Sequence, residues 1–159
     1  MVAMNADVTI EVLESADDSV LEAFVRLIPL LSGSAPVPDR ERVERVLGHA
    51  GNTVFAAWGR VRAGEGERRI LGLLTLVVIE LPTGTEARVE DVVVDGEARG
   101  LGLGRALVVA ALSAAAGWGA RHVDLTSAPR RVAARRLYQS LGFEPRETGV
   151  FRHTLDAYR

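Results

Sequence analysis

The sequence contains neither cysteine nor lysine, and these two absences exclude several kinds of chemistry. Without cysteine there is no disulfide, no thiolate zinc site and no cysteine nucleophile. All 19 basic side chains are arginine, which excludes a side-chain Schiff base and the phosphate-binding lysine of a Walker motif. Any reaction must therefore use carboxylates, hydroxyls, backbone amides or arginine.

Aromatic residues, histidines and long apolar runs are also scarce. Aromatic residues make up 5% of the chain and the formal net charge is −2, so nothing points to a nucleic-acid partner. His49, His122 and His153 show no short-range ligand spacing, so no metal site is expected. The longest apolar run, residues 70–81, is too short to span a bilayer, and the first residues lack a signal-peptide pattern. We therefore expect a cytoplasmic protein without a membrane partner.

The length and the hydrophobic periodicity predict one α/β domain over residues 1–159, with a core from about 8 to 156. Three successive strands separated by turn residues favour an antiparallel meander, and an alanine-rich helix follows it. The expected order is strand, two helices, three strands, helix, strand, helix and two strands, which gives about seven strands. The strands are expected at 8–13, 53–58, 70–80, 87–95, 121–127, 143–146 and 150–155, and the helices at about 15–31, 39–47, 104–117 and 130–141.

Residues 99–104 place glycines at alternate positions between an apolar strand and the alanine-rich helix. Such a segment leaves several backbone N–H groups unobstructed, and the helix N-terminus adds about half a positive charge, so it suits a phosphate or pyrophosphate. The simpler alternative is a tight strand-to-helix connection. A dinucleotide fingerprint does not fit, because its sixth position must be Gly or Ala. Here the sixth position is Arg105 counting from Gly100, or Leu107 counting from Gly102.

Two segments resemble hallmarks of the Gcn5-related N-acetyltransferase (GNAT) family. The first hallmark, Gln/Arg-x-x-Gly-x-Gly/Ala after an apolar strand, is matched by residues 99–104 following Val92–Val94. The second, an alanine-containing helix that ends in Leu/Phe-Tyr-x-x-Leu-Gly-Phe, is matched by residues 133–143. One helix and one strand separate the two segments, as in the family. The resemblance covers about residues 8–156 and implies a mixed sheet.

The resemblance also implies the cofactor, acetyl-CoA, in a gap where the fourth and fifth strands (about 87–95 and 121–127) splay apart. The pyrophosphate would lie on the glycine segment, and the pantetheine amides would bond to the backbone of the fourth strand. Many family members carry asparagine seven residues before the motif tyrosine, whereas here that position is Arg131. The residues expected to bind the cofactor are Val92, Val93, Val94, Arg99, Gly100, Leu101, Gly102, Leu103, Gly104, Arg105 and Ala134.

Two side chains are the candidates for moving protons when an amine attacks the thioester in a ternary complex. Tyr138 matches the tyrosine that protonates the departing CoA thiolate in many relatives. Glu90 or Asp91, or a water, would accept the amine proton. We favour Glu90, because its strand resembles that of glucosamine-6-phosphate N-acetyltransferases, where the glutamate lies by the substrate. The alternative is that either acid is a surface charge or pairs with an arginine.

The function that the resemblance implies is acetyl transfer from acetyl-CoA to an amine. The acceptor, a small molecule or a peptide N-terminus, is not readable from the sequence, although the adjacent acids favour a cationic amine. The alternative is a non-catalytic acyl-CoA-binding regulator on the same fold. Relatives are often homodimers, and the sequence does not decide the oligomeric state.

Overall fold

The computed structural model describes residues 8–31, 35–62 and 66–155 of the chain. These residues belong to two compact units, Met1–Ser127 and Ala128–Arg159. The first unit contains the sheet and the glycine segment, and the second contains the helix that carries the motif tyrosine.

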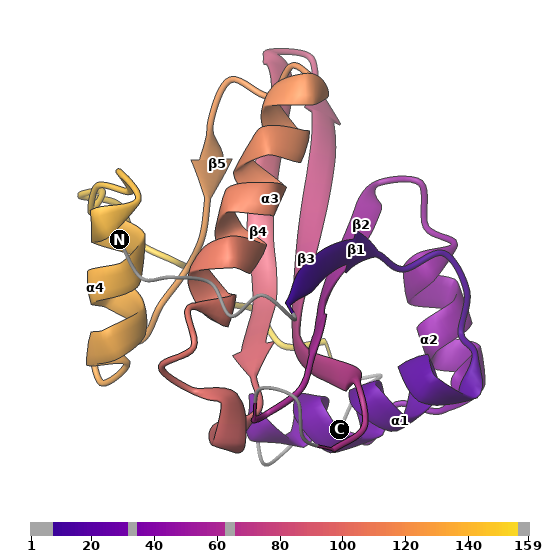
Figure 1. The fold of residues 1–159 in the computed structure, drawn as a ribbon. Coiled ribbons are helices and arrows are strands. Elements are labelled where there is room, and N and C mark those ends of the chain that lie inside the picture. The colour runs from indigo at the N-terminus through magenta and orange to yellow at the C-terminus, as the bar shows by residue number, and fades with distance from the viewer. Residues whose placement is uncertain (1–7, 32–34, 63–65, 156–159) are drawn as a thin grey trace. The chain divides into compact units, whose positions relative to one another are not determined.

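A mixed sheet forms the centre of the first unit, and its strands follow one another in chain order (Figure 1). Neighbouring strands are antiparallel from β1 to β4, and β5 runs parallel to β4. The expected α/β fold, the antiparallel meander and the mixed sheet are thereby confirmed. The strands in the described residues are β1 (Thr9–Val12), β2 (Asn52–Gly59), β3 (Arg69–Leu81), β4 (Gly84–Val94) and β5 (Val123–Asp124).

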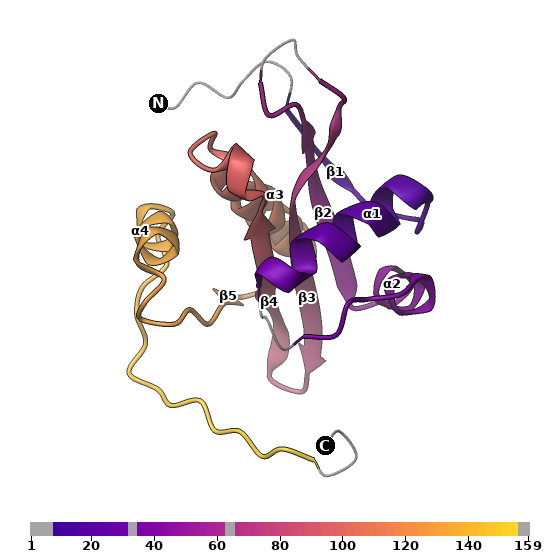
Figure 2. The ribbon, with the colours of Figure 1, turned by 90° about the horizontal axis from the view of Figure 1, so that it is seen from below.

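Helices cover both faces of this sheet, with α3 on one side and α1 and α2 on the other (Figure 2). Asp17 caps α1 by accepting a hydrogen bond from the N–H of Val20, and Asp39 caps α2 in the same way through Arg42. An aspartate at this position satisfies one of the free N–H groups of the first turn, as the sequence around Asp39 predicts. The helices of this unit are α1 (Asp18–Leu27), η1 (Ile28–Leu30), α2 (Arg40–Leu47), η2 (Gly96–Ala98) and α3 (Leu103–Gly117).

The core of the first unit is apolar on both sides of the sheet. Val20, Phe24 and Leu27 recur at helical spacing on α1 and pack with Val43 of α2 against the sheet. On the other side, α3 buries Leu107 and several small residues. A Cβ at Gly72 of β3 would lie 3.1 Å from Leu107 Cδ1 and 3.0 Å from the carbonyl oxygen of Val93, so the close approach of α3 requires glycine there.

The second unit is built around α4 (Val132–Ser140), and its remaining described residues form no regular element. The two final strands expected at 143–146 and 150–155 are therefore wrong, and the described residues contain five strands instead of about seven. The sequence indicated a final strand at residues 150–155, but Phe151 is 98% exposed and Val150 is 77% exposed. No described strand bonds to this segment, and a strand without a partner is not stable.

No helix in the described parts of the chain is long and apolar enough to cross a membrane.

Candidate functional site

The edge of β4 that faces β5 is paired over a very short distance. β5 pairs with β4 only at Ala87 and Arg88. Beyond that point, Val89–Val94 has no strand on this side in the described residues, which is the divergence expected from the sequence. Strand N–H and C=O groups that lose their ladder partners require other partners. An extended ligand that carries amide groups can supply them along this edge.

A β-bulge interrupts β4 next to this unpaired edge. Glu90 lies opposite Thr75 of β3 and Val93 lies opposite Leu73, so Asp91 and Val92 together face the single residue Leu74. Asp91 has a φ of 50° and is the one residue other than glycine with positive φ among those described. The sequence predicted a regular strand here, in which successive side chains would point to opposite faces, and the bulge breaks that simple alternation.

The two adjacent acids of β4 have different surroundings. The Nε of Arg88 donates a hydrogen bond of 3.0 Å to Glu90 Oε1, which forms an ion pair within the strand. Asp91 is exposed, and no described residue donates a hydrogen bond to its carboxylate. Partial desolvation by the surrounding protein raises the pKa of Asp91 above its usual value, and the negative charge of Glu90 raises it further.

The glycine segment forms the turn that starts α3. Gly100 and Gly102 have φ values of 81° and 79°, in the left-handed region that glycine adopts without strain. Gly102 is the N-cap of α3 and offers no side chain to the free N–H groups of the first turn. In the described chain, no acceptor receives the N–H groups of Gly100, Leu101 or Gly104. The positive end of the helix dipole and these free donors give the turn the chemistry that suits an anion.

Asp95 holds the chain between β4 and the glycine segment. It is 8% exposed, and its Oδ1 accepts a hydrogen bond of 3.1 Å from the N–H of Glu97 in η2. Its Oδ2 is bonded to the guanidinium of Arg26 on α1 and lies 3.2 Å from Nη2 of Arg69 on β3. The N–H of Asp95 also bonds to the carbonyl of Leu71. This carboxylate therefore fixes the start of the segment that leads to the glycines.

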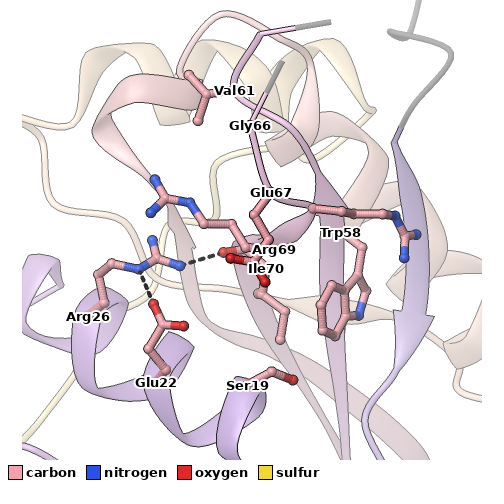
Figure 3. A pocket seen from close by; sticks show the side chains of 10 residues that line it. Ser19, Glu22, Arg26, Trp58, Val61, Gly66, Glu67, Arg69 and Ile70 are labelled. Atoms are coloured by element: carbon pink, nitrogen blue, oxygen red, sulfur yellow. Dashed lines mark hydrogen bonds and ion pairs between the residues drawn. The ribbon is translucent and has the colours of Figure 1, made fainter. Parts of the chain in front are cut away.

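A cavity of about 320 Å³ lies beside Arg26 and Arg69, between α1 and the start of β3 (Figure 3). Arg26 and Arg69 line it, together with Trp58 of β2. In this cavity Arg26 bonds to Glu22 and to the carbonyl of Ile70, as the dashed lines show. The cavity is thus a polar recess beside the Asp95 network.

Tyr138 lies in the second unit, where it is half-buried on α4. Its ring contacts that of Phe143 edge-to-face, with centroids 5.8 Å apart. Gly142 has a φ of 88°, and the N–H of Phe143 bonds to the carbonyl of Tyr138, which is a Schellman ending. Burial raises the pKa of the Tyr138 phenol, and the charge of Arg131 partly offsets this. The phenol therefore stays protonated at neutral pH and can donate a proton.

The predicted cofactor residues are distributed over both units. Val92–Val94 and Arg99–Arg105 lie on one continuous stretch of the first unit, from the unpaired edge of β4 to the first turn of α3. Ala134 is half-buried on α4, one helical turn before Tyr138. Arg131, at the family's asparagine position, precedes the first residue of α4, and its N–H donates to the carbonyl of Ala128.

The network around Asp95 was not expected from the sequence. An Asp-Gly pair after an apolar strand is a signal for a side chain that caps the following turn. That signal was present at Asp95, but its partners Arg26 and Arg69 are distant in the chain and carry no mark of their own.

The free donors of the first unit fit the phosphates and the amide-bearing arm of coenzyme A. The glycine turn offers N–H groups to a pyrophosphate, and the edge of β4 offers backbone groups to an extended amide chain. The Ser127 hydroxyl oxygen is buried without a hydrogen-bond partner in the described structure, which leaves another polar atom to be satisfied. No group of three or more His, Asp or Glu side chains that could hold a metal ion occurs in the residues described.

Comparisons with known proteins agree with this geometry. The protein-family model for the acetyltransferase (GNAT) family matches residues 25–143 of this chain. No curated protein matches the chain.

Several solved structures share the fold. An aminoglycoside acetyltransferase from an uncultured soil metagenomic sample, in complex with trehalose, is 22% identical, with a TM-score of 0.78 over 96% of this chain and 99% of that one. The aminoglycoside acetyltransferase AAC(6')-Iy, in complex with a bisubstrate CoA analogue, is 18% identical, with a TM-score of 0.72 over 94% of this chain and 99% of that one. A transcriptional regulator from Bacillus halodurans is 26% identical, with a TM-score of 0.73 over 92% and 99%.

Proposed function

Because the chain belongs to the acetyltransferase (GNAT) family, we propose that it is an N-acetyltransferase that moves the acetyl group of acetyl-CoA to a small-molecule amine. The observation that carries the proposal is the continuous stretch from the unpaired edge of β4 to the uncapped N-terminus of α3. This stretch offers amide partners and an anion-binding turn in the order in which the pantetheine arm and the pyrophosphate follow each other in coenzyme A.

The binding residues divide by the part of the cofactor that they hold. The N–H groups from Gly100 to Arg105 would bind the pyrophosphate, with the α3 dipole adding to the attraction. The backbone of Val92–Val94 would bond to the pantetheine amides. Bound in this way, acetyl-CoA supplies a thioester carbonyl that an amine can attack.

Proton movement is assigned to two kinds of side chain. A carboxylate on β4, for which the sequence favoured Glu90, accepts the proton that the amine loses. Tyr138 donates a proton to the departing thiolate, and the raised pKa of its phenol keeps that proton available at neutral pH. Ala134, on the same helix, would contact the cofactor.

We propose a cationic small molecule as the acceptor. Glu90 and Asp91 place two acidic groups side by side on β4, which attracts a positively charged amine. The aminoglycoside acetyltransferases that share the fold are named for polycationic substrates, in line with this class. A peptide N-terminus carries one positive charge and is the competing acceptor.

The second candidate function is a regulator that binds acyl-CoA without transferring the acetyl group. The similarity to a protein described as a transcriptional regulator favours keeping this candidate. A regulator would retain the anion-binding turn but would have no use for a proton acceptor on β4.

A thiol-release assay with an amine panel tests the proposal. Because the chain has no cysteine, every thiol detected comes from CoA and not from the protein. The panel contains aminoglycosides, polyamines, amino sugars, amino acids and peptides with free N-termini. We expect one cationic small-molecule class to accelerate CoA release. Binding of CoA without release in the presence of any amine would favour the regulator, and release with peptides alone would reassign the acceptor.

Substitution of Gly102 tests the anion-binding turn. We expect Gly102→Val to abolish CoA binding in calorimetry, because a β-branched residue is strained at a φ of 79° and crowds the free N–H groups. Gly117→Val at the other end of α3 is the matched control, since a side chain there meets nothing within 4 Å. CoA affinity that is unchanged in Gly102→Val would remove the turn from the site.

A further inference from the structure

We propose that Asp91, rather than Glu90, is the group that accepts the proton from the acceptor amine. This assignment rests on the proposed acetyl transfer and names the proton acceptor within it. Three observations carry it: the backbone at Asp91, the partner of Glu90, and the place of the bulge along the unpaired edge of β4.

The backbone at Asp91 is held in a conformation that L-residues with a side chain rarely adopt. Its φ of 50° lies in the left-handed region, where asparagine and aspartate are tolerated better than other residues but still less well than glycine. The bulge that imposes this conformation puts Asp91 and Val92 opposite one residue of β3. Strained backbone of this kind is concentrated at functional sites, and glycine, the unstrained choice, is absent from this position.

Glu90 is already engaged by a neighbour. The Nε of Arg88 donates to Glu90 Oε1 at 3.0 Å, and the two side chains are similarly exposed, at 36% and 41%. A proton taken up by Glu90 would disrupt this ion pair. The carboxylate of Asp91 receives no hydrogen bond from any described residue, so it can take a proton without losing a partner.

The surroundings of Asp91 also improve its chemistry as a base. Desolvation and the neighbouring charge of Glu90 raise the pKa of Asp91, which brings it closer to the pKa of the amine. A base whose pKa is closer to that of its proton donor accepts the proton with a smaller loss of free energy. The charged groups described around it on β4 are Glu90 and, through Glu90, Arg88.

The bulge lies in the stretch of β4 that has no described strand on the β5 side, and Asp91 directly precedes the three valines expected to bond with the pantetheine arm. A carboxylate at this point is adjacent in the chain to the backbone that would hold the end of that arm. An amine that approaches the thioester along this edge would therefore meet Asp91.

The acceptor arrives as an ammonium ion and gives one proton to the Asp91 carboxylate. The freed nitrogen lone pair forms the C–N bond to the carbonyl carbon, and the C–S bond breaks with its electron pair on sulfur. The nitrogen loses a second proton and the thiolate gains one, so that one proton in total passes from Asp91 to solvent.

The test compares Asp91→Asn with Glu90→Gln on two amines. The first is the alkylamine that the wild-type protein acetylates best, and the second is its alkoxyamine counterpart, which is already neutral at pH 7. For Asp91→Asn we expect kcat/KM to fall about 100-fold with the alkylamine, within the range for loss of a general base, and less than about 10-fold with the alkoxyamine. The Kd for CoA should stay within about twofold. A larger loss in Glu90→Gln than in Asp91→Asn would overturn the assignment.

Two further variants guard against structural effects. Asp91→Gly also removes the carboxylate and suits the positive φ, so it folds without strain and should show the same selective loss. Asp18→Asn on α1 makes the same chemical change at a fully exposed side chain and should leave both rates unchanged. If the wild-type protein releases no CoA with any amine, the proposed function fails and this assignment with it. If it does release CoA and Asp91→Asn matches it on the alkylamine, only this assignment fails.

Discussion

Asp95 offers the sharpest test of how the first unit holds its anion-binding turn. The substitution Asp95→Asn keeps the shape of the side chain and the oxygen that accepts from the N–H of Glu97, but it removes the charge. Arg26 and Arg69 then share no carboxylate at that point. We expect the free energy of unfolding to fall and CoA affinity to fall with it.

The exposure of the three side chains sets the size of the loss. Breaking a fully buried ion pair by removal of one partner costs about 3–5 kcal/mol. Here the Asp95 side chain is 11% exposed, but those of Arg26 and Arg69 are 25% and 35% exposed, so water can solvate the released guanidiniums. Each arginine also keeps another acidic partner, Glu22 or Glu97. We therefore expect a loss of about 2–3 kcal/mol, which corresponds to a decrease in Tm of about 4–12 °C.

Thermal unfolding and CoA calorimetry on the same samples measure both effects. Glu97→Gln is the matched control, because its side chain is 72% exposed and pairs with the same Arg69. Exposed pairs contribute about 0–1 kcal/mol, so its Tm should change by less than about 4 °C. A Tm for Asp95→Asn within 2 °C of wild type would refute the reasoning, whatever happens to CoA binding.

Three further predictions concern Asp91, Tyr138 and the glycine that ends α4. For Asp91→Asn we expect a Tm at pH 7 equal to or above that of the wild-type protein. The pKa of Asp91 is raised in the folded state, so the wild-type protein loses stability as the pH rises through that pKa and the carboxyl ionises. The gain in Tm of the variant should therefore vanish at pH 3, where Asp91 is protonated in the wild-type protein as well. A lower Tm for the variant at pH 7 would contradict the direction of the shift. For Tyr138→Phe we expect kcat to fall about 100-fold, since a general acid is lost, while the Kd for CoA stays within twofold; equal kcat would reduce Tyr138 to a packing residue. For Gly142→Ala we expect the free energy of unfolding, measured with a chemical denaturant, to fall by about 1–2 kcal/mol, because an L-residue is strained at a φ of 88°. The control is Gly96→Ala, since Gly96 has no positive φ and an added side chain there meets nothing within 4 Å. Equal stabilities of the two variants would argue against the Schellman ending.

Local signals in the sequence were sufficient for most of the first unit. Asp39 marked the start of α2 because its side chain caps the first turn, and strand-like runs separated by turn residues located β2, β3 and β4. The glycines at 100 and 102 indicated a connection between strand and helix with unobstructed N–H groups, and in the structure both glycines have positive φ. These features depend on residues within a few positions of each other, which is why the sequence predicts them.

Features that depend on distant contacts were not predictable. The bulge in β4 is marked by Asp91 and not by glycine, so its positive φ has no signal in the sequence. In the Asp95 network, Arg26 lies 69 positions before Asp95 in the chain and Arg69 lies 26 positions before it. Nothing in the sequence around either arginine distinguishes it from a surface charge. Residues 150–155 were expected to form a strand, but a short segment cannot supply the partner strand that it needs.

Because β5 pairs with β4 only at Ala87 and Arg88, the rest of β4 is an open edge of the sheet on the β5 side. Open edges invite strands of other molecules to add to them, and natural proteins guard such edges with charges and irregularities that spoil the hydrogen-bonding register. The β4 edge from Val89 to Val94 contains both, in the exposed acid Asp91 and in the bulge on which it sits. A strand of a second copy of the chain could not form a regular ladder of hydrogen bonds at this edge. A thin, flexible ligand with a few amide groups does not need a regular ladder to bind there. The same irregularity that exposes the carboxylate of Asp91 thereby guards this edge of β4 against the addition of a strand from a second copy.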